Sequence, residues 1–358
     1  MCGFFFVCNF IRVRKTVLME FKLEFLYEYG LFFAKTVTFV IAFAIITALI
    51  VGASAKPKSG KGELTMENLS EQLNNQKKEL LNVALDKEAF KAFEKSEKKK
   101  LKDKKTEPKN KVFVLTFKGG IDAKEVESLR KEVTAIIQIA QSNDKVVVKL
   151  ESGGGVVHGY GLAASQLARL KQAGLELIVS VDKIAASGGY MMACVSDKFV
   201  CAPFAMIGSI GVIAQLPNFN KLLKKNSVEF EQITAGEFKR TLTMFGENTE
   251  SGREKFKQEL EQIHALFRDH VQVARPTLDV EKVATGETWF GTDALKMGLV
   301  DEIQTSDDLL LSLNNQFELY HVAYKSKKGL SDRIGLGASS LLDNVAEKIL
   351  SKTKELYH

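Results

Sequence analysis

The chain has 358 residues, enough for one large domain or two small ones, and its composition, 45% hydrophobic and 26% charged, is that of a chain that mostly folds. The formal net charge of +6 would suit a polyanionic partner, but much of the excess lies in one lysine-rich stretch, residues 87–111, which we expect to lie outside the folded domain. Because no basic patch is interleaved with aromatic residues, a solvated linker is favoured over a nucleic-acid site.

The clearest segment near the start of the chain is a hydrophobic run. Residues 36–55 (TVTFVIAFAIITALIVGASA) carry no charge and match the hydrocarbon core of a bilayer in length. The small residues at 53–55 resemble a signal-peptide cleavage site, but the run is longer than a typical signal core, so we expect an uncleaved transmembrane anchor. Residues 1–35 form the N-terminal segment before it, and a second methionine, Met19, is an alternative start of translation.

After the anchor, residues 56–110 are polar and rich in lysine, which predicts a partly helical spacer. From residue 111 onward, short β-branched runs alternate with longer helical patterns. We expect strands at 112–117, 146–150, 175–181, 198–202 and 228–233, and helices at 123–141, 161–173, 188–195 and 251–274. Apolar strands that lack alternation are typical of a buried parallel sheet, so residues 111–324 predict one α/β domain with a mainly parallel sheet. We expect little chemistry in the tail, residues 325–358.

The four cysteines do not form a recognisable metal-binding or redox pattern. They are Cys2, Cys8, Cys194 and Cys201, with no C-x-x-C pair and no Cys/His spacing that suits zinc. For Cys194 and Cys201, two buried free thiols are favoured over a disulfide. Nothing in the sequence requires a metal or a cofactor.

The first of two glycine-rich turns is residues 151–155 (ESGGG), between a predicted strand and a helix. Consecutive glycines let backbone N–H groups approach a ligand closely, and a following helix favours negative charge, so the turn suits a phosphate or a developing oxyanion. The spacing is neither that of a P-loop nor that of a dinucleotide-binding fingerprint. A flexible turn without a ligand remains the alternative.

The second turn, residues 185–190 (AASGGY), holds Ser187 between a strand and a helix, with only small neighbours to shield it. A nucleophile requires such an exposed hydroxyl on a rigid turn, followed by an N–H aimed at the attacked carbonyl. The Gly-x-Ser-x-Gly elbow is not fully matched, because Ala185 stands at the first glycine position. A serine that only caps the helix remains the alternative.

A serine nucleophile needs a base, and the five histidines supply it poorly. His264 and His270 lie in the long charged helix, and His158, three residues beyond the first glycine turn, is the one credible candidate. A lysine can take this role when burial keeps its amine neutral. Lys239, in residues 234–240 (TAGEFKR), follows a predicted strand and a glycine turn, but composition alone does not select it among the other lysines.

Several ordered motifs resemble those of the signal peptide peptidase family of membrane-bound bacterial serine proteases. They are LESGGGVVHGYGLAASQL, VDKIAASGGYMMACVSDK, APFAMIGSIGVIAQLPNF, TAGEFKRTL and ATGETWFGTDALKMGLVDEI. The resemblance runs from about residue 63 into the last third of the chain. It implies a ClpP/crotonase-like fold with a mainly parallel sheet.

The resemblance also implies roles for individual residues. Ser187 stands at the position of the family's nucleophile, and Lys239 stands at that of its general base. Gly154 and Gly188 would supply the N–H groups of the oxyanion hole, although Gly153 replaces the proline that the family usually has in this turn. Among neighbouring residues, Ser209 and Gly155 are expected to line the site, and Ser209 is a candidate to orient the base.

The resemblance therefore implies a single-pass serine endopeptidase of the bacterial inner membrane, with the catalytic domain on the periplasmic face. Its substrates would be extended apolar peptides, such as signal peptides or misfolded envelope proteins. Relatives assemble into rings or domes, in some of which the serine and the lysine come from neighbouring protomers, so we expect a homo-oligomer. A crotonase-like acyl-CoA enzyme and a non-catalytic membrane scaffold are the alternatives.

Overall fold

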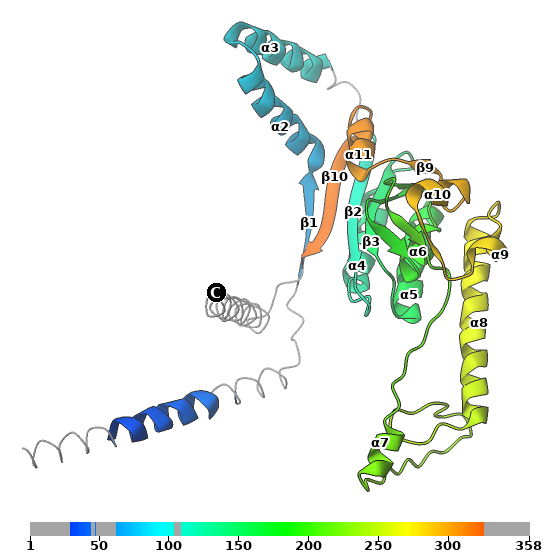
Figure 1. Cartoon of the computed structure of the whole chain (residues 1–358). Coiled ribbons are helices and arrows are strands. Elements are labelled where there is room, and N and C mark those ends of the chain that lie inside the picture. Colours follow the sequence, from blue (N-terminus) through cyan, green and yellow to red (C-terminus); the bar gives the residue numbers. More distant parts are fainter. Residues whose placement is uncertain (1–28, 44–46, 48–61, 104–108, 326–358) are drawn as a thin grey trace, which may run out of the picture. The chain divides into compact units, whose positions relative to one another are not determined.

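The computed structural model describes residues 29–43, 47, 62–103 and 109–325 (Figure 1). Gly62–Lys325 form one compact unit. Residues 29–43, in a separate unit, are helical with exposed side chains. No helix in the described ranges is long and apolar enough to cross a bilayer. Part of the expected anchor (44–46 and 48–55), the alternative start at Met19 and the tail from residue 326 lie outside the described residues.

The compact unit alternates strands and helices along most of its length. In chain order they are β1 (Glu63–Asn68), α2 (Leu69–Ala84), α3 (Lys87–Asp103), β2 (Lys111–Gly119), α4 (Val126–Ile139), β3 (Lys145–Ser152), α5 (Val157–Gln172), β4 (Glu176–Val181), β5 (Ile184–Ala186), α6 (Gly188–Ala193), β6 (Lys198–Cys201), β7 (Met206–Gly208), α7 (Asn220–Lys225), α8 (Glu250–Ala274), α9 (Val280–Val283), β8 (Thr288–Phe290), α10 (Gly291–Lys296), β9 (Glu302–Ile303), α11 (Ser306–Asn314) and β10 (Glu318–Lys325).

The strands form one sheet in the order β1-β10-β2-β3-β4-β6-β9, and the short strands β5, β7 and β8 branch from it. Pairing is parallel throughout, except that β1 pairs β10 and β7 pairs β8 in antiparallel fashion. The prediction of an α/β fold with a mainly parallel sheet is therefore confirmed.

Most residues of the central strands are buried on both faces of the sheet, which explains their predominantly apolar sequences. In β2, Phe113 and Leu115 face the larger core, while Val112 and Val114 face a smaller one on the other side. The larger core includes residues of α4, α5, α6 and α8, and the smaller one includes Leu309 of α11. The sheet is thus held rigid from both sides, which suits a framework for a site at its edge.

Two expectations about this part of the chain need correction. The compact unit begins at Gly62 rather than at residue 111, because β1 adds an edge strand through its antiparallel pairing with β10. Residues 63–68, expected to belong to the spacer, thus form a strand of the sheet, and the helices α2 and α3 follow them. Residues 228–233, expected to form a strand, are irregular and exposed, because no neighbouring strand pairs with them.

The chain between β7 and α8 contains only one short helix, α7, and extends away from the sheet alongside α8 (Figure 1). Helix α8 begins with a regular cap, in which the Thr249 hydroxyl accepts the N–H of Gly252. Near its other end, Phe267 and Val271 are buried in the larger core. Helix α8 therefore connects the extension with the body of the unit.

Candidate active site

Ser187 lies in a strained turn between β5 and α6. Its backbone has φ 52° and ψ −119°, a conformation sparsely populated by residues other than glycine. Such a conformation costs on the order of 1–3 kcal/mol and persists only where the surroundings impose it. Here the Ser187 N–H donates to Gly208 O at 2.8 Å, and Ser187 O accepts from Met191 N–H at 2.9 Å. The turn leaves the side chain half-buried, and its hydroxyl makes no hydrogen bond within the described part of the chain.

The first glycine turn lies directly against Ser187. Gly154 has φ 87°, which favours glycine, and an added Cβ there would lie 2.6 Å from Gly188 N and 2.8 Å from Ser187 Cβ. An added Cβ on Gly188 would in turn collide with the ring of Tyr160. The two turns approach each other so closely that a side chain at either position would collide with its neighbours. Glycine is therefore required at both positions, although the turns are distant in the sequence.

The expected oxyanion hole needs a correction. The N–H of Gly154 donates to the hydroxyl of Ser152 at 3.0 Å, so it is not free to bind an oxyanion. The N–H groups of Gly155 and Gly188 have no hydrogen-bond partner among the described residues. Gly188 and Gly155, which line the same cavity as Ser187, thus each carry an unpaired N–H among the described residues.

Ser187 opens into a cavity of about 930 Å³. Its walls are mainly apolar and come from the glycine turn, α6, α8 and the chain after β7, including Val157, Met191, Ile213 and Phe267. Apolar walls with a few polar groups are typical of a ligand site. The cavity can therefore hold an uncharged, mainly apolar group against the serine hydroxyl.

Ser209, expected to line the site, does line this cavity. It has φ 54° and donates its N–H to Glu287 O, and the preceding carbonyl, Gly208 O, accepts the N–H of Ser187. The Gly208–Ser209 turn thus supports the backbone of Ser187. No hydrogen bond of the Ser209 hydroxyl to a base is seen within the described residues.

Lys239 is not brought to Ser187 within the protomer. It is exposed in the extension between β7 and α8 and lines a different cavity of about 740 Å³, together with Phe230, Ile233 and Phe245. The structure thus brings together Ser187, Gly154, Gly155, Gly188 and Ser209, and leaves Lys239 elsewhere.

Among the histidines, the structure reverses the order expected from the sequence. His158 is exposed and does not line the Ser187 cavity, whereas His264 of α8 does. The signal for His264 lies in the helical spacing of Ile263, Phe267 and Val271, which marks the inward face of α8. The many charges on the helix concealed this pattern.

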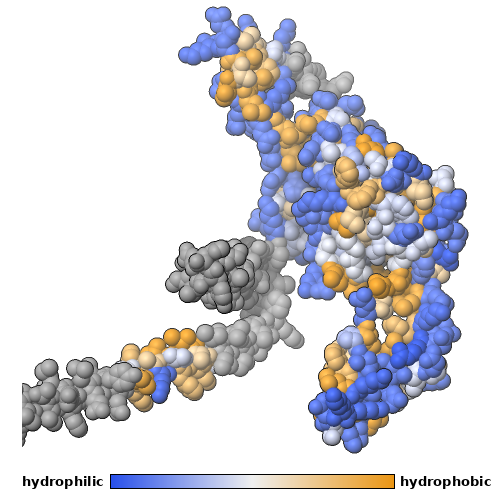
Figure 2. Space-filling model, viewed as in Figure 1, coloured by the Kyte–Doolittle hydropathy of each residue, from blue (hydrophilic) through white to orange (hydrophobic). Residues whose placement is uncertain are grey.

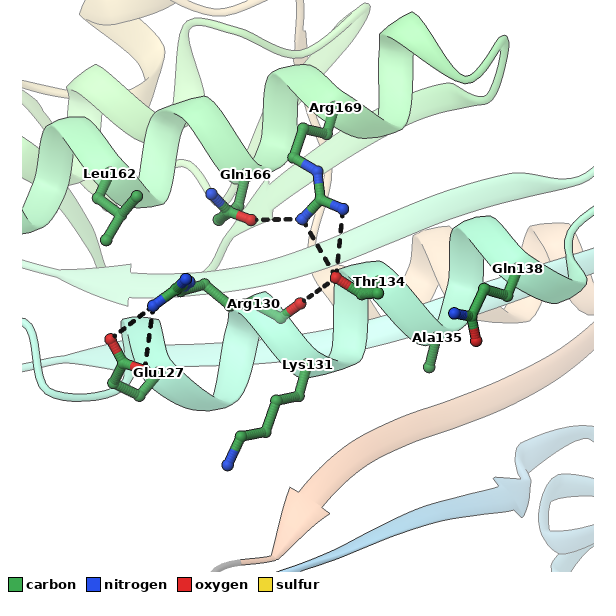
Figure 3. A pocket seen from close by; sticks show the side chains of 9 residues that line it. All are labelled: Glu127, Arg130, Lys131, Thr134, Ala135, Gln138, Leu162, Gln166 and Arg169. Atoms are coloured by element: carbon green, nitrogen blue, oxygen red, sulfur yellow. Dashed lines mark hydrogen bonds and ion pairs between the residues drawn. The ribbon is translucent and has the colours of Figure 1, made fainter.

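A third cavity, about 790 Å³, lies between α4 and α5 (Figure 3). Five of its polar side chains, those of Glu127, Arg130, Thr134, Gln166 and Arg169, form hydrogen bonds within the group. Arg130 binds the carboxylate of Glu127, and Arg169 donates to Gln166 Oε1 at 2.7 Å and to Thr134 Oγ1 at 3.2 Å. The Thr134 hydroxyl itself donates to the carbonyl of Arg130 at 2.7 Å. The Thr134 hydroxyl of this cavity is therefore not a free nucleophile.

The thiols of Cys194 and Cys201 are free and buried, which confirms that no disulfide joins them. Burial raises the pKa of Cys194 to about 12 and that of Cys201 to about 11. Since the thiolate is the reactive form, both thiols are inert as nucleophiles at neutral pH.

Comparison with known proteins adds a family match. The model of "Peptidase family S49 N-terminal" matches residues 24–167, and that of "Peptidase family S49" matches residues 169–320. The chain is 48% identical over 338 residues to the probable protease SohB of Haemophilus influenzae, covering 90% of this chain and 96% of the relative. Protease 4 of the same organism is 27% identical over 202 residues, covering 54% of this chain and 33% of the relative.

A further relative and one solved structure are similar to the chain. A probable protease SohB of Buchnera aphidicola subsp. Schizaphis graminum is 49% identical over 314 residues, covering 85% of this chain and 92% of the relative. The structure of a 1510-N membrane-bound stomatin-specific protease aligns with a TM-score of 0.39 and 17% identity, covering 57% of this chain and 85% of that chain.

Proposed function

The chain belongs to peptidase family S49 as a protease of the SohB type, and from this premise we propose that it hydrolyses peptide bonds with a Ser187–Lys239 dyad. The observation that carries the proposal is the Ser187 turn. Ser187, with its strained backbone and unpaired hydroxyl, lines a mainly apolar cavity together with Gly188 and Gly155, whose N–H groups are unpaired among the described residues. The fold assigned to this unit is ClpP/crotonase-like.

The substrates we assign are extended apolar peptides, such as signal peptides or misfolded envelope proteins. Apolar walls in the Ser187 cavity support this choice. Residues 211–215 also line or adjoin the cavity and make no backbone–backbone hydrogen bond within the described chain. Free backbone N–H and C=O groups in an extended segment are what a substrate strand needs for pairing.

In the proposed reaction, neutral Lys239 takes the proton of the Ser187 hydroxyl as the oxygen attacks the peptide carbonyl. The N–H groups of Gly188 and Gly155 stabilise the oxyanion. The ammonium of Lys239 then protonates the leaving amine. Water, activated by the same amine, hydrolyses the acyl-enzyme and regenerates the serine.

The proposal requires Lys239 to come from a neighbouring protomer. Lys239 lies in an exposed extension that carries a series of exposed apolar side chains, and Figure 2 shows apolar residues gathered there. These residues are Ile213, Leu216, Phe219, Leu222, Val228, Phe230, Ile233, Phe238, Met244 and Phe245. Exposed apolar surface of this kind marks an interaction site, and a second copy of the chain is the partner that would also complete the dyad.

We assign the protein to the bacterial inner membrane, with residues 36–55 as a single-pass anchor and the catalytic unit on the periplasmic face. The support is the uncharged run of the sequence itself. External protease added to spheroplasts should degrade the catalytic unit without lysis. If the catalytic unit is degraded only after lysis, it lies on the cytoplasmic face instead.

The proposed chemistry is tested with an activated fluorophosphonate, which modifies nucleophilic serines, and with a quenched apolar peptide. We expect the reagent to label Ser187 and to stop cleavage. Ser187→Ala and Lys239→Ala should each abolish cleavage while the melting temperature stays unchanged. Full activity in either variant would contradict the proposed Ser187–Lys239 dyad. An acyl-CoA enzyme of the same fold would remain unlabelled at Ser187.

A further inference from the structure

Tyr160 of α5 is a fully buried polar residue at the candidate active site, and the proposed mechanism gives it no role. An added Cβ on Gly188 would collide with the ring carbon Cγ of Tyr160, so the ring packs directly against the backbone of the serine turn. Phe117 of β2 meets the same ring edge-on, with 6.4 Å between the ring centroids. The ring of Tyr160 therefore has a fixed position next to Gly188.

The hydroxyl of Tyr160 belongs to a small buried hydrogen-bond network. It lies 2.5 Å from Ser152 Oγ, a contact in which either hydroxyl can donate, and 2.7 Å from the acceptor Gly120 O. The hydroxyl of Ser152, itself buried, also lies 3.0 Å from Gly119 O and accepts the N–H of Gly154 at 3.0 Å. One serine side chain thus connects Tyr160 with the end of β2 and with the first glycine turn.

This network fixes the backbone that faces the Ser187 cavity. Ser152 Oγ holds the N–H of Gly154. The next peptide group carries the N–H of Gly155, which is unpaired among the described residues and lines the cavity. Hydrogen-bond donors stabilise a transition state only when they are already oriented toward the developing charge, and a small displacement is costly. A group that fixes this turn can therefore affect the reaction without touching the substrate.

We propose that Tyr160 is a positioning residue of the peptidase reaction, which holds the N–H groups of Gly155 and Gly188 in place for the oxyanion. Its hydroxyl acts on Gly155 through Ser152, and its ring acts on Gly188 by direct contact. Neither Tyr160 nor Ser152 is among the described residues that line the Ser187 cavity, so neither touches the substrate. This inference rests on the proposed function, because the oxyanion forms only in that reaction.

The test is Tyr160→Phe in the full-length protein, with the quenched apolar peptide as substrate. Phenylalanine keeps the ring and removes only the hydroxyl. Because the oxyanion is present only in the transition state, kcat should fall about 10-fold while KM changes less than about 2-fold. Ser152→Ala removes the same network from its other end and should also lower kcat. The two losses should not add in the double variant, since both act through one network.

A peptide aldehyde gives a readout that a loss of stability alone does not change. Its adduct with Ser187 carries an oxygen in the place of the oxyanion, so its inhibition constant should also rise about 10-fold in Tyr160→Phe. An intact fluorescent peptide bound to Ser187→Ala forms no oxyanion. Its affinity should therefore stay the same when Tyr160→Phe is added to that variant.

The matched control is Tyr190→Phe, which removes an equally buried hydroxyl from α6. That hydroxyl donates to Leu299 O at 3.1 Å and has no bond to the first glycine turn within the described residues. Both phenylalanine variants lose buried hydrogen bonds, so each should lower the melting temperature by about 2–4 °C. Only Tyr160→Phe should lower kcat and weaken inhibition by the aldehyde.

The outcomes separate this inference from the proposed function. If the unmodified protein is labelled at Ser187 and cleaves the peptide, but the two phenylalanine variants lose equal activity or none, the inference on Tyr160 alone is overturned. A raised KM with unchanged kcat would also overturn it, because that result marks a substrate contact. If Tyr160→Phe does not fold, Ser152→Ala decides by the same measurements. If Ser187 is not labelled and no peptide is cleaved, the proposed function fails and the inference fails with it.

Discussion

At the scale of single residues, the space beside Ser187 is set by glycines. Gly154 faces Gly188 N and Ser187 Cβ so closely that a methyl group at position 154 must displace one of them, and φ 87° adds strain for any other residue. Gly154→Ala should therefore move the free N–H of Gly188 out of place. We expect kcat/KM for peptide cleavage to fall by about 10²-fold or more, the usual effect of losing an oxyanion donor.

The matched control for this prediction is Gly161→Ala. Gly161 lies inside α5, and an added Cβ would have no neighbour within 4 Å. Alanine is more favourable than glycine in a helix by about 1 kcal/mol, so the melting temperature should rise by about 2–4 °C with activity unchanged. Equal losses of activity in both variants would contradict the steric role of Gly154.

Individual residues also show what the sequence can and cannot reveal about the site. The glycines and Ser187 could be predicted, because turns between strands and helices leave a local sequence signal. Which backbone N–H groups of the glycine turn remain unpaired could not be predicted. The N–H of Gly154 donates to the hydroxyl of Ser152, and this hydrogen bond depends on the folded geometry of the turn. The place of His264 at the cavity was missed for a similar reason, because it depends on which side of α8 meets the cavity.

At the scale of elements, the buried strands were predictable and the short or exposed ones were not. β2, β3, β4 and β6 have mostly apolar sequences because both faces of the sheet are covered there. β1 is largely exposed, and its pairing with β10 joins residues distant in the sequence, so no local pattern identifies it. The three-residue strands at the site, β5 and β7, are too short for any periodicity.

Strand β10, which lies between β1 and β2, depends on a buried carboxylate. Glu132 of α4 is 7% exposed, and its Oε1 accepts the N–H of Tyr324 at 2.7 Å. Burial raises the pKa of Glu132 above its usual value, so the folded state favours the protonated form. Stability from this group is therefore greatest below the ordinary glutamate pKa and is lost as pH rises through the raised one.

Glu132→Gln should consequently stabilise the protein at neutral and alkaline pH. Glutamine keeps an acceptor for Tyr324 and removes the buried charge. In thermal unfolding at a series of pH values, the melting temperature of the variant should exceed that of the unmodified protein at pH 8. The gap should close as pH falls toward the ordinary glutamate pKa. Glu127→Gln, an exposed carboxylate on the same helix, should show no such dependence. A gap that widens in acid would contradict the assignment.

At the scale of the whole molecule, the extension between β7 and α8 is the part that the isolated protomer explains least. It exposes Ile213 and Ile233 at 79% and 95%. It also holds Lys239, while the serine cavity lies against the body of the unit. Such an arrangement is expected when a surface is completed by another copy, so that burial of the extension and assembly of the dyad occur together.

This view predicts that two inactive variants restore activity together. If each site takes its serine from one protomer and its lysine from the next, co-expressed Ser187→Ala and Lys239→Ala chains form mixed rings. A site is complete where the unaltered Ser187 of one chain meets the unaltered Lys239 of its neighbour. With equal amounts and random mixing, about a quarter of the sites should be complete, giving about a quarter of the full peptidase activity. Each variant expressed alone should be inactive. If the dyad instead forms within one protomer, every chain lacks one of the two residues and the mixture stays inactive.

Ile233→Asp, which places a charge on the exposed apolar surface, should lower both the oligomer mass in light scattering and the restored activity.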